Sequence, residues 1–310
     1  MDLCKNHMKI LCIVGATGTG KNEFGLALAK RFGGEIVNFD SRQIYKGFPI
    51  ITAQPDEQEK KVCRHHLYGF LEPVKKLSAG EFADYADKKI KEISDRGNIP
   101  ILIGGTGLYL KALLFGLAPI PNIPQNIREQ VIREYLRDGA LASYEKLKKI
   151  DPEYSKKIHP MDKQRITRAL EVYRFTKKNL TWYHKNYPTD KPRYNYLKIG
   201  IFYPKEELIA RLESRINKML EKGGVEEVAR AWEKNPDVNA PVWTSIGCRE
   251  LLDYIQGKCS LEEAKYKWLK NTKKYAKRQM TWFKKENDIN WYEYKELDKA
   301  ICEIERFLNE

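Results

Sequence analysis

A glycine-rich segment ending in lysine is the part of this sequence best suited to chemistry. It reads Gly15-Ala16-Thr17-Gly18-Thr19-Gly20-Lys21 and has the spacing of a P-loop. Glycines let successive backbone N–H groups turn towards phosphate oxygens, and the lysine adds a mobile positive charge. The segment therefore predicts a site for a chain of phosphates; the alternative is a glycine-rich turn that binds nothing.

The residue after the lysine departs from this motif. A P-loop has Ser or Thr there, whose hydroxyl binds Mg²⁺, whereas this chain has Asn22. An amide oxygen can bind magnesium, but more weakly than it can hydrogen-bond to the backbone. Either the metal ion is held mainly by phosphates and water, or this site binds its metal in an unusual way. Asn22 is the candidate protein ligand.

Two further polar residues each follow an apolar segment. Asp40 ends the segment 35–40, and Thr106 follows 99–103 in a second glycine-rich turn. Ligands of α/β proteins bind where the carboxyl ends of parallel strands meet. Asp40 is therefore a candidate metal ligand or general base, the alternative being a turn or helix-capping aspartate. Ser41, Arg42 and Gln43, which follow it, are residue types that contact nucleic-acid bases.

The elements that must position these residues alternate between strand and helix patterns. Apolar strands at 10–14, 35–40 and 99–103, each followed by a helical pattern, predict a parallel doubly wound sheet of the P-loop NTPase-like α/β type. From residue 118 three prolines precede a charged, helical stretch without strand pattern. We expect an all-helical insertion domain at 120–193, and an α/β core formed by 1–119 and 194–310. A strand at 196–202, a helix at 205–222 and helices from about 244 and 261 complete the expected chain. Residues 54–74 are expected to form a loop. In the insertion, the first helix is expected to carry Ile127, Val131, Ile132, Tyr135 and Leu136 on one apolar side, and a later helix to begin with Asp162 as its N-cap.

The composition points to a polyanionic partner. The 310 residues carry a formal charge of +14 and are 42% hydrophobic and 11% aromatic, which excludes a disordered protein. Such charge favours nucleic acid or an anionic membrane surface. Residues 261–285 hold nine Lys or Arg against two Glu, interleaved with aromatic residues. That pattern suits phosphate contact and base stacking, although a solvated basic helix face would look alike.

Other sequence features bound the protein's environment. No apolar segment approaches the 18 residues of a membrane span, and the first residues lack a signal core, so we expect a cytoplasmic protein. The six cysteines form no CxxC pair and are expected to be reduced thiols. No partner helix is evident, and monomer is the default expectation.

Several motifs, taken in order, resemble the tRNA dimethylallyltransferase family. Besides the P-loop they are FDSRQIYKG (39–47), HHLYGFLEP (65–73), IPILIGGTGLYLKALL (99–114), DKQRITRALEVY (162–173), SIGCRELLDY (245–254) and YAKRQMTWF (275–283). The resemblance covers nearly the whole chain. It implies transfer of the dimethylallyl group from dimethylallyl diphosphate to N6 of the adenosine next to the anticodon on its 3′ side, with release of diphosphate.

The resemblance also implies roles for the residues of the donor site. Gly15 to Lys21, with Asn22, would bind the diphosphate of the donor in place of ATP. Asp40 would be the general base for the exocyclic amine, and Thr106 would line the channel between donor and base. Lys21, Thr17, Arg249 and Mg²⁺ would stabilise the departing diphosphate.

The tRNA anticodon stem-loop would, on the same resemblance, be held by four groups of residues. The core supplies Asp40, Ser41, Arg42, Gln43 and Thr106, and the basic helix Lys277 and Arg278. The turn at 244–249 supplies Thr244, Ser245, Ile246, Gly247, Cys248 and Arg249, although the family has an aromatic residue where this chain has Cys248. The insertion supplies Arg128, Gln164, Arg165, Ile166, Thr167 and Arg168, with Arg165 and Arg168 contacting phosphates.

Three other functions fit parts of the pattern. An adenylate isopentenyltransferase shares the core but acts on free nucleotides and has no need of the basic insertion and helix. A P-loop kinase would use Asp40 as a metal ligand and would turn over ATP. An inactive RNA-binding P-loop protein is compatible with Asn22, but the presence of both Asp40 and Thr106 argues against it.

Overall fold

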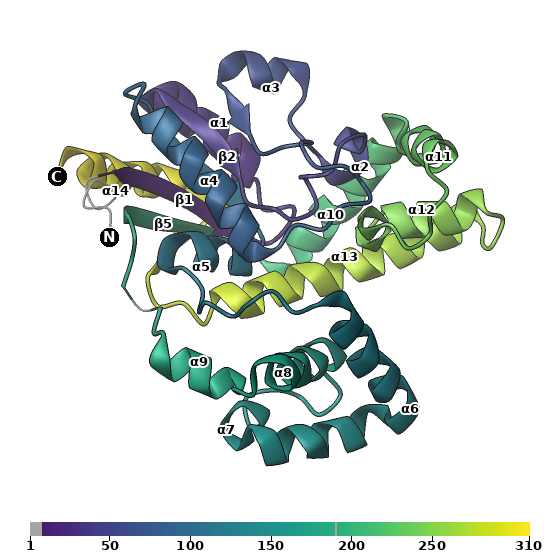
Figure 1. Cartoon of the computed structure of the whole chain (residues 1–310). Coiled ribbons are helices and arrows are strands. Elements are labelled where there is room, and N and C mark those ends of the chain that lie inside the picture. The colour runs from purple at the N-terminus through teal and green to yellow at the C-terminus, as the bar shows by residue number, and fades with distance from the viewer. Residues whose placement is uncertain (1–7, 190) are drawn as a thin grey trace. The chain divides into compact units, whose positions relative to one another are not determined.

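The computed structural model describes residues 8–189 and 191–310; Cys4, one of the expected reduced thiols, lies outside them. The chain forms two compact units. Met1–Leu114 and Arg193–Glu310 make one, here called the core unit, and Phe115–Pro192 make the other, here called the helical unit. Both are drawn in Figure 1.

The core unit contains a six-stranded, fully parallel sheet in the order β3-β2-β4-β1-β5-β6. The strands are β1 (Lys9–Gly15), β2 (Gly34–Asn38), β3 (His65–His66), β4 (Ile99–Gly104), β5 (Asn195–Phe202) and β6 (Ile289–Glu293). Val14 pairs with Gly104, and Asn38 with Ile103, so β1, β2 and β4 end side by side. This arrangement confirms the predicted parallel α/β sheet and brings the P-loop, Asp40 and Thr106 to one edge.

Helices cover both faces of this sheet. α1 (Lys21–Phe32) and α14 (Leu297–Asn309) join one strand face in a single apolar cluster. α4 (Ala79–Ser94) and α13 (Leu261–Phe283) contact β4 and β1 but are absent from that cluster, so they cover the other face. Both helices begin with capping boxes, Ser78 with Glu81 and Ser260 with Glu263, which satisfy backbone N–H groups of the first turn.

A second apolar cluster supports the ends of the strands. It is formed mainly by α2 (Pro49–Thr52), α10 (Lys205–Glu221), α11 (Gly224–Lys234), η2 (Pro241–Thr244) and α12 (Cys248–Ile255), with Trp243 and Trp268 at its centre. α3 (Glu57–Val62), α5 (Gly107–Phe115) and η3 (Tyr294–Glu296) complete the helices described for the core unit. This cluster fixes the position of α10 beside the P-loop.

The structure corrects four expectations about the elements. α11 was not predicted, and α12 begins at Cys248, since Pro241–Thr244 is a short 3₁₀ turn. Residues 54–74, expected to be a loop, contain α3 and the edge strand β3. The chain also does not end with the basic helix, because β6 and α14 follow it. β6 is a partly exposed edge strand of five residues, which gives little periodic signal.

The helical unit is built from α6 (Gln125–Ile150), α7 (Pro152–Ser155), α8 (Lys163–Thr176) and α9 (Leu180–Asn186), with no strand among its described residues. Asp162 caps α8 as predicted, accepting a hydrogen bond from Arg165 N at 3.0 Å. α6 is interrupted at Gly139, whose φ is 83°. The expected apolar stripe of α6 is partly wrong: Val131 is buried, but Ile132 and Leu136 are exposed.

None of the helices in the described part of the chain combines the length and the apolar composition needed to cross a membrane.

Candidate active site

The glycine-rich loop joins the buried end of β1 to the first turn of α1. Gly18 and Gly20 have φ of 83° and 79°, in the left-handed region that favours glycine. A Cβ at Gly18 would lie 2.7 Å from Leu212 on α10, and one at Gly20 would lie 2.3 Å from Tyr294. The loop is therefore pressed against both neighbours and could not accommodate side chains at these positions. Gly15, Ala16, Thr19 and Gly20 are buried, whereas Thr17, Gly18 and Lys21 are partly exposed.

Lys21 is held inside the loop and lies close to other charges. Its Nζ donates a hydrogen bond to Ala16 O at 2.5 Å. Burial and the neighbouring Arg215 guanidinium lower the pKa of Lys21 to about 8, although the Asp40 carboxylate acts in the opposite direction. Burial likewise lowers the pKa of Arg215. Two cations thus share one partly desolvated place, as expected of a site built for an anion.

A cleft of ≈ 850 Å³ opens in front of this loop. Its walls come from the P-loop, the end of β2, the α2 region, α10 and α13. The predicted site residues that line it are Thr17, Gly18, Thr19, Gly20, Lys21, Asn22, Asp40, Arg42, Gln43, Thr244, Ile246 and Arg278. One cavity is therefore lined by both the glycine-rich loop and the candidate base.

Hydrogen bonds beyond the end of β2 orient Asp40. Asn38 Oδ1 accepts from Asp40 N at 2.8 Å, and Asp40 Oδ1 accepts from Arg42 N at 2.9 Å. Thr106 Oγ1 accepts from Ser41 N at 2.9 Å and donates to Ser41 Oγ at 3.2 Å. Thr106 does not line the cleft; it links the turn after β4 to the turn that carries Asp40. The Thr106 hydroxyl also hydrogen-bonds Tyr275, which does line the cleft.

Two arginines of α10 belong to the site although the sequence motifs did not predict them. Arg211 and Arg215 both line the cleft, and Arg211 Nε donates to Gly18 O at 3.0 Å. Arg211 also lies over the rings of Tyr203 and Tyr294, 4.6 and 5.5 Å from their centroids. Arg211 and Arg215 are four residues apart on an amphipathic helix that follows a core strand, and this spacing is the sequence signal that could have identified them.

Arg249 is not among the residues that line this cleft, contrary to its predicted diphosphate contact. It is exposed on α12, with Nε 3.6 Å from Asp253 Oδ1. In its place, the structure puts Arg215 beside Lys21 and Asp40. A diphosphate contact of Arg249 therefore stays a prediction, since sequence alone did not give the position of α12 relative to the P-loop.

The structure brings several of the predicted tRNA residues of the core unit together. Arg42 Nη1 donates to Thr244 Oγ1 at 2.7 Å, joining the turn after β2 to η2. Arg278 lies 5.5 Å from the Tyr275 ring centroid. Gln43 is buried, and its Nε2 donates to the Thr52 and Ala53 carbonyls, so it supports the wall formed by α2.

Two residues of the turn at 244–249 have side chains that cannot contact RNA as they stand. Ser245 is 1% exposed and Cys248 0%, and Cys248 packs in the second apolar cluster. A Cβ at Gly247 would lie 2.7 Å from Trp268, so this turn is closely packed as well. The side chains of Ser245 and Cys248 belong to the protein interior, and tRNA binding by these two residues stays a prediction. Lys277 on α13 is exposed.

The predicted tRNA residues of the helical unit divide into an exposed and a buried set. Gln164 and Arg165 are exposed, while Arg168 is half-buried and has Nη1 3.8 Å from Glu171 Oε2. Arg128 Nη2 donates to Asn122 Oδ1 at 2.8 Å, and its charge lies near Arg168 and Glu171. Ile166 is fully buried and Thr167 is buried with its hydroxyl donating to the Lys163 carbonyl. The side chains of Ile166 and Thr167 face the interior of this unit, and tRNA binding by these two residues stays a prediction.

The protein's own groups could supply only part of a metal site. The described residues include no cluster of three or more His, Cys, Asp or Glu placed to hold a metal ion. Asn22 and Glu23 lie at the start of α1 and line the cleft. A Mg²⁺ bound here would therefore take most of its oxygen ligands from phosphate and water.

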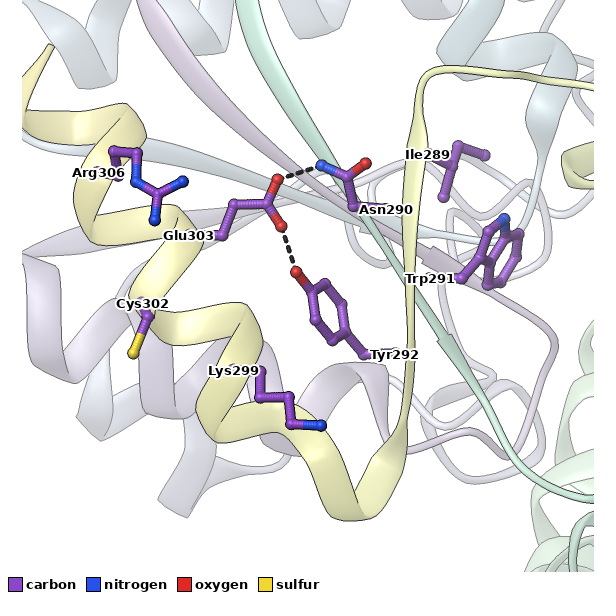
Figure 2. A pocket seen from close by; sticks show the side chains of 8 residues that line it. All are labelled: Ile289, Asn290, Trp291, Tyr292, Lys299, Cys302, Glu303 and Arg306. Carbon is purple, nitrogen blue, oxygen red and sulfur yellow. Dashed lines mark hydrogen bonds between the residues drawn. The ribbon is translucent and has the colours of Figure 1, made fainter.

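A second cavity, of ≈ 560 Å³, lies between β6 and α14 (Figure 2). Its glutamate, Glu303, accepts hydrogen bonds from the Asn290 amide and the Tyr292 hydroxyl. Figure 2 shows these groups turned towards one another across the cavity. It shares no lining residue with the cleft, and its glutamate is already bonded by the Asn290 amide and the Tyr292 hydroxyl. We therefore assign the chemistry to the cleft.

Comparison with known proteins decides the family. A family model described as IPP transferase matches residues 43–286. The chain belongs to the IPP transferase family. Within it, a tRNA dimethylallyltransferase of Maridesulfovibrio salexigens is 49% identical over 306 residues, covering 99% of both chains. One from Nitratidesulfovibrio vulgaris (strain DSM 19637 / Miyazaki F) is 44% identical, covering 94% of this chain and 90% of the relative.

Solved structures of IPP transferases are similar as well. A full-length tRNA isopentenylpyrophosphate transferase from Bacillus halodurans matches with a TM-score of 0.70 and 33% identity, covering 97% of this chain and 95% of that one. A eukaryotic dimethylallyltransferase acting on tRNA matches with a TM-score of 0.78 and 28% identity, covering 94% of this chain and 75% of that one. These matches confirm the family resemblance of the motifs and the predicted fold class.

Proposed function

We propose that this IPP transferase moves the dimethylallyl group of dimethylallyl diphosphate to N6 of the adenosine on the 3′ side of the anticodon in tRNA, releasing diphosphate. The observation that carries the proposal is the cleft, in which Lys21 and Arg215 lie with the Asp40 carboxylate. An anion-binding loop beside a carboxylate suits a reaction with a diphosphate leaving group and a proton to remove. The names of the relatives supply the donor and the acceptor.

In this proposal the donor binds through its diphosphate. The backbone N–H groups of the loop and the N-terminus of α1 surround the phosphates. Lys21 and Arg215 neutralise the charge that grows as the bond between the allylic carbon and oxygen breaks. Arg211 acts one step further away by holding the Gly18 carbonyl and, with it, the loop. Mg²⁺, if bound, would be held by Asn22 and the diphosphate and would supply further positive charge.

The acceptor meets the donor at Asp40. The adenine N6 attacks the allylic carbon, the electron pair of the breaking carbon–oxygen bond leaves with diphosphate, and the N6 proton passes to the Asp40 carboxylate. An aromatic amine is a weak nucleophile, so alignment and proton removal must provide much of the acceleration. The adenosine must leave its stack to reach this place, as in other base-modifying enzymes.

The tRNA would be held by cationic groups on both units. Arg42, Thr244 and Arg278 surround the acceptor side of the cleft. In the helical unit, whose tRNA contact is part of the proposal, Gln164, Arg165, Arg168 and Arg128 offer donors to the phosphate chain. The formal charge of +14 supports a nucleic-acid partner over a small nucleotide. In this proposal the enzyme works in the cytoplasm, where tRNA is found, and as a monomer.

The test is transfer from labelled dimethylallyl diphosphate, with unmodified tRNA and AMP offered in separate reactions. Label should enter tRNA and not AMP. A tRNA carrying guanosine at the acceptor position is the matched control and should remain unlabelled. Label in AMP would move the protein to the free-nucleotide enzymes. ATP turnover without prenyl transfer would contradict the proposal altogether.

A further inference from the structure

Gln279 on α13 bridges the two loops on which the proposed reaction depends. Its Oε1 accepts a hydrogen bond from Thr17 N at 2.9 Å, and its Nε2 donates to Gly105 O at 3.1 Å. Thr17 belongs to the P-loop after β1, and Gly105 to the turn after β4. The side chain is 4% exposed; its hydrogen bond to Gly105 O is buried and the one from Thr17 N is partly buried.

The bridge begins where the sheet ends. β1 and β4 are neighbours and pair up to Val14 with Gly104. Beyond that pair the two chains turn into separate loops, and the Gln279 amide donates to one backbone and accepts from the other. It thus takes the place of a peptide group between them. Because an amide has fixed length and one donor end and one acceptor end, it sets both the distance and the relative register of the two loops.

The side-chain amide of Gln279 occupies the space in which a side chain at position 105 would lie. A Cβ on Gly105 would lie 1.8 Å from Gln279 Nε2 and 3.6 Å from Asp40 Oδ2. Both groups therefore lie next to the same point in the structure. The next residue, Thr106, accepts a hydrogen bond from Ser41 N, beside Asp40. A continuous chain of contacts thus runs from the diphosphate loop through Gln279 to the turn that carries the base.

We propose that Gln279 is a positioning residue that sets the separation between the leaving-group loop and the general base Asp40. It touches neither substrate nor the reacting atoms, and it acts through the Thr17 and Gly105 backbones. The inference rests on the proposed prenyl transfer. Misplacement of reacting groups by about 1 Å can cost about 100-fold in rate. Loss of the bridge should therefore lower kcat and leave the binding of each substrate nearly unchanged.

The first variant is Gln279→Leu, which keeps the volume of the side chain and removes both hydrogen bonds. We expect kcat to fall about 10- to 100-fold, with the KM for donor and for tRNA each within about threefold of wild type. The matched control is Trp282→Phe. Trp282 packs against Gly107 of the same turn, one helical turn along α13, and its Nε1 donates to Glu286. It has no contact with Thr17 or Gly105 among the described hydrogen bonds.

The second variant, Gln279→Glu, separates positioning from packing by its pH profile. A carboxylate keeps an acceptor for Thr17 N but repels the Gly105 carbonyl, whereas a neutral carboxylic acid can donate to it. Burial raises the pKa of a glutamate. For Gln279→Glu, kcat relative to wild type should therefore rise about threefold or more when the pH is lowered from 8 to 6. For Gln279→Leu, kcat relative to wild type should stay constant over the same range.

The two proposals fail in different ways. If the wild-type protein transfers no prenyl group to tRNA, the proposed function is wrong. If the wild type is active and the kcat of Gln279→Leu lies within about twofold of the wild-type kcat, the positioning role is overturned. An equal loss in Trp282→Phe, or equal pH dependence of the Glu and Leu variants, would show that α13 only packs against the loop. Melting temperatures confirm that all variants are folded when assayed.

Discussion

The charge state of Lys21 should control donor capture in the alkaline range. Burial and Arg215 lower the pKa of Lys21 to about 8 in the protein without ligand. The lysine is then about 90% protonated at pH 7 but only about 10% protonated at pH 9. Only the protonated form can neutralise diphosphate. The value of kcat/KM for dimethylallyl diphosphate should therefore fall about tenfold between pH 7 and pH 9.

The profile of kcat should differ from that of kcat/KM. Bound diphosphate adds negative charge next to Lys21, which raises the pKa of the lysine. Since kcat reports the loaded enzyme and kcat/KM the free enzyme, the alkaline fall of kcat should begin at higher pH. The assay is steady-state transfer to saturating tRNA at varied donor concentration, in buffers of constant ionic strength from pH 6.5 to 10.

Lys21→Arg is the control for this assignment. A guanidinium stays charged over the whole range but fits a lysine site imperfectly. The variant should be slower, and its kcat/KM should lose the fall centred near pH 8. A level wild-type profile up to pH 10, or the same fall in Lys21→Arg, would refute the reasoning, because another group would then be titrating.

Three further changes test other parts of the structure. Asp40→Ala should lower kcat by about 10²- to 10⁴-fold as the general base is lost and leave tRNA affinity nearly unchanged; a large loss of affinity would make Asp40 a binding residue. Neutralising Arg165 and Arg168 together should weaken tRNA binding and reduce the salt slope by about 1 to 2, with the donor KM as the internal control; an unchanged slope would remove them from the interface. Lys198 is 2% exposed and pairs with carboxylates at 2.6 and 3.1 Å, so Lys198→Met should cost about 1–3 kcal/mol in urea unfolding. The exposed ion pair between Lys299 and Glu296 is the comparison. Lys299→Met should lower the free energy of unfolding by less than about 0.5 kcal/mol; equal losses for the Lys198 and Lys299 variants would contradict the importance of burial.

The donor side of the cleft could be predicted from sequence because its signal is local. Strand, glycine loop and helix follow one another within residues 10–29, and the backbone geometry that binds phosphate is contained in that segment. Asp40 was also within reach, since the carboxyl ends of parallel strands meet at one edge. In both cases a short-range pattern and a general rule of topology were sufficient.

Arg215 and Gln279 could not be given roles in the same way. Arg215 is far from Lys21 in sequence, and its place depends on how α10 packs on the P-loop through Leu212. Gln279 belonged to a recognised motif, but its role appears only when Gly105 and Thr17 are seen on either side of its amide. Ile166 and Cys248 show the reverse case. They lie within motifs of the family, yet their side chains are interior.

The electrostatics of the cleft bear on the order of events in the proposed reaction. Before the donor arrives, two carboxylates favour the charged forms of both Lys21 and Arg215, and Asp40 has a larger effect than Glu23. Diphosphate brings more negative charge to the same two cations and competes with Asp40 for them. Donor binding therefore leaves the carboxylate to the incoming amine, while the cations face the leaving group. With Gln279 holding the two loops at a set separation, one binding event would prepare both ends of the reaction.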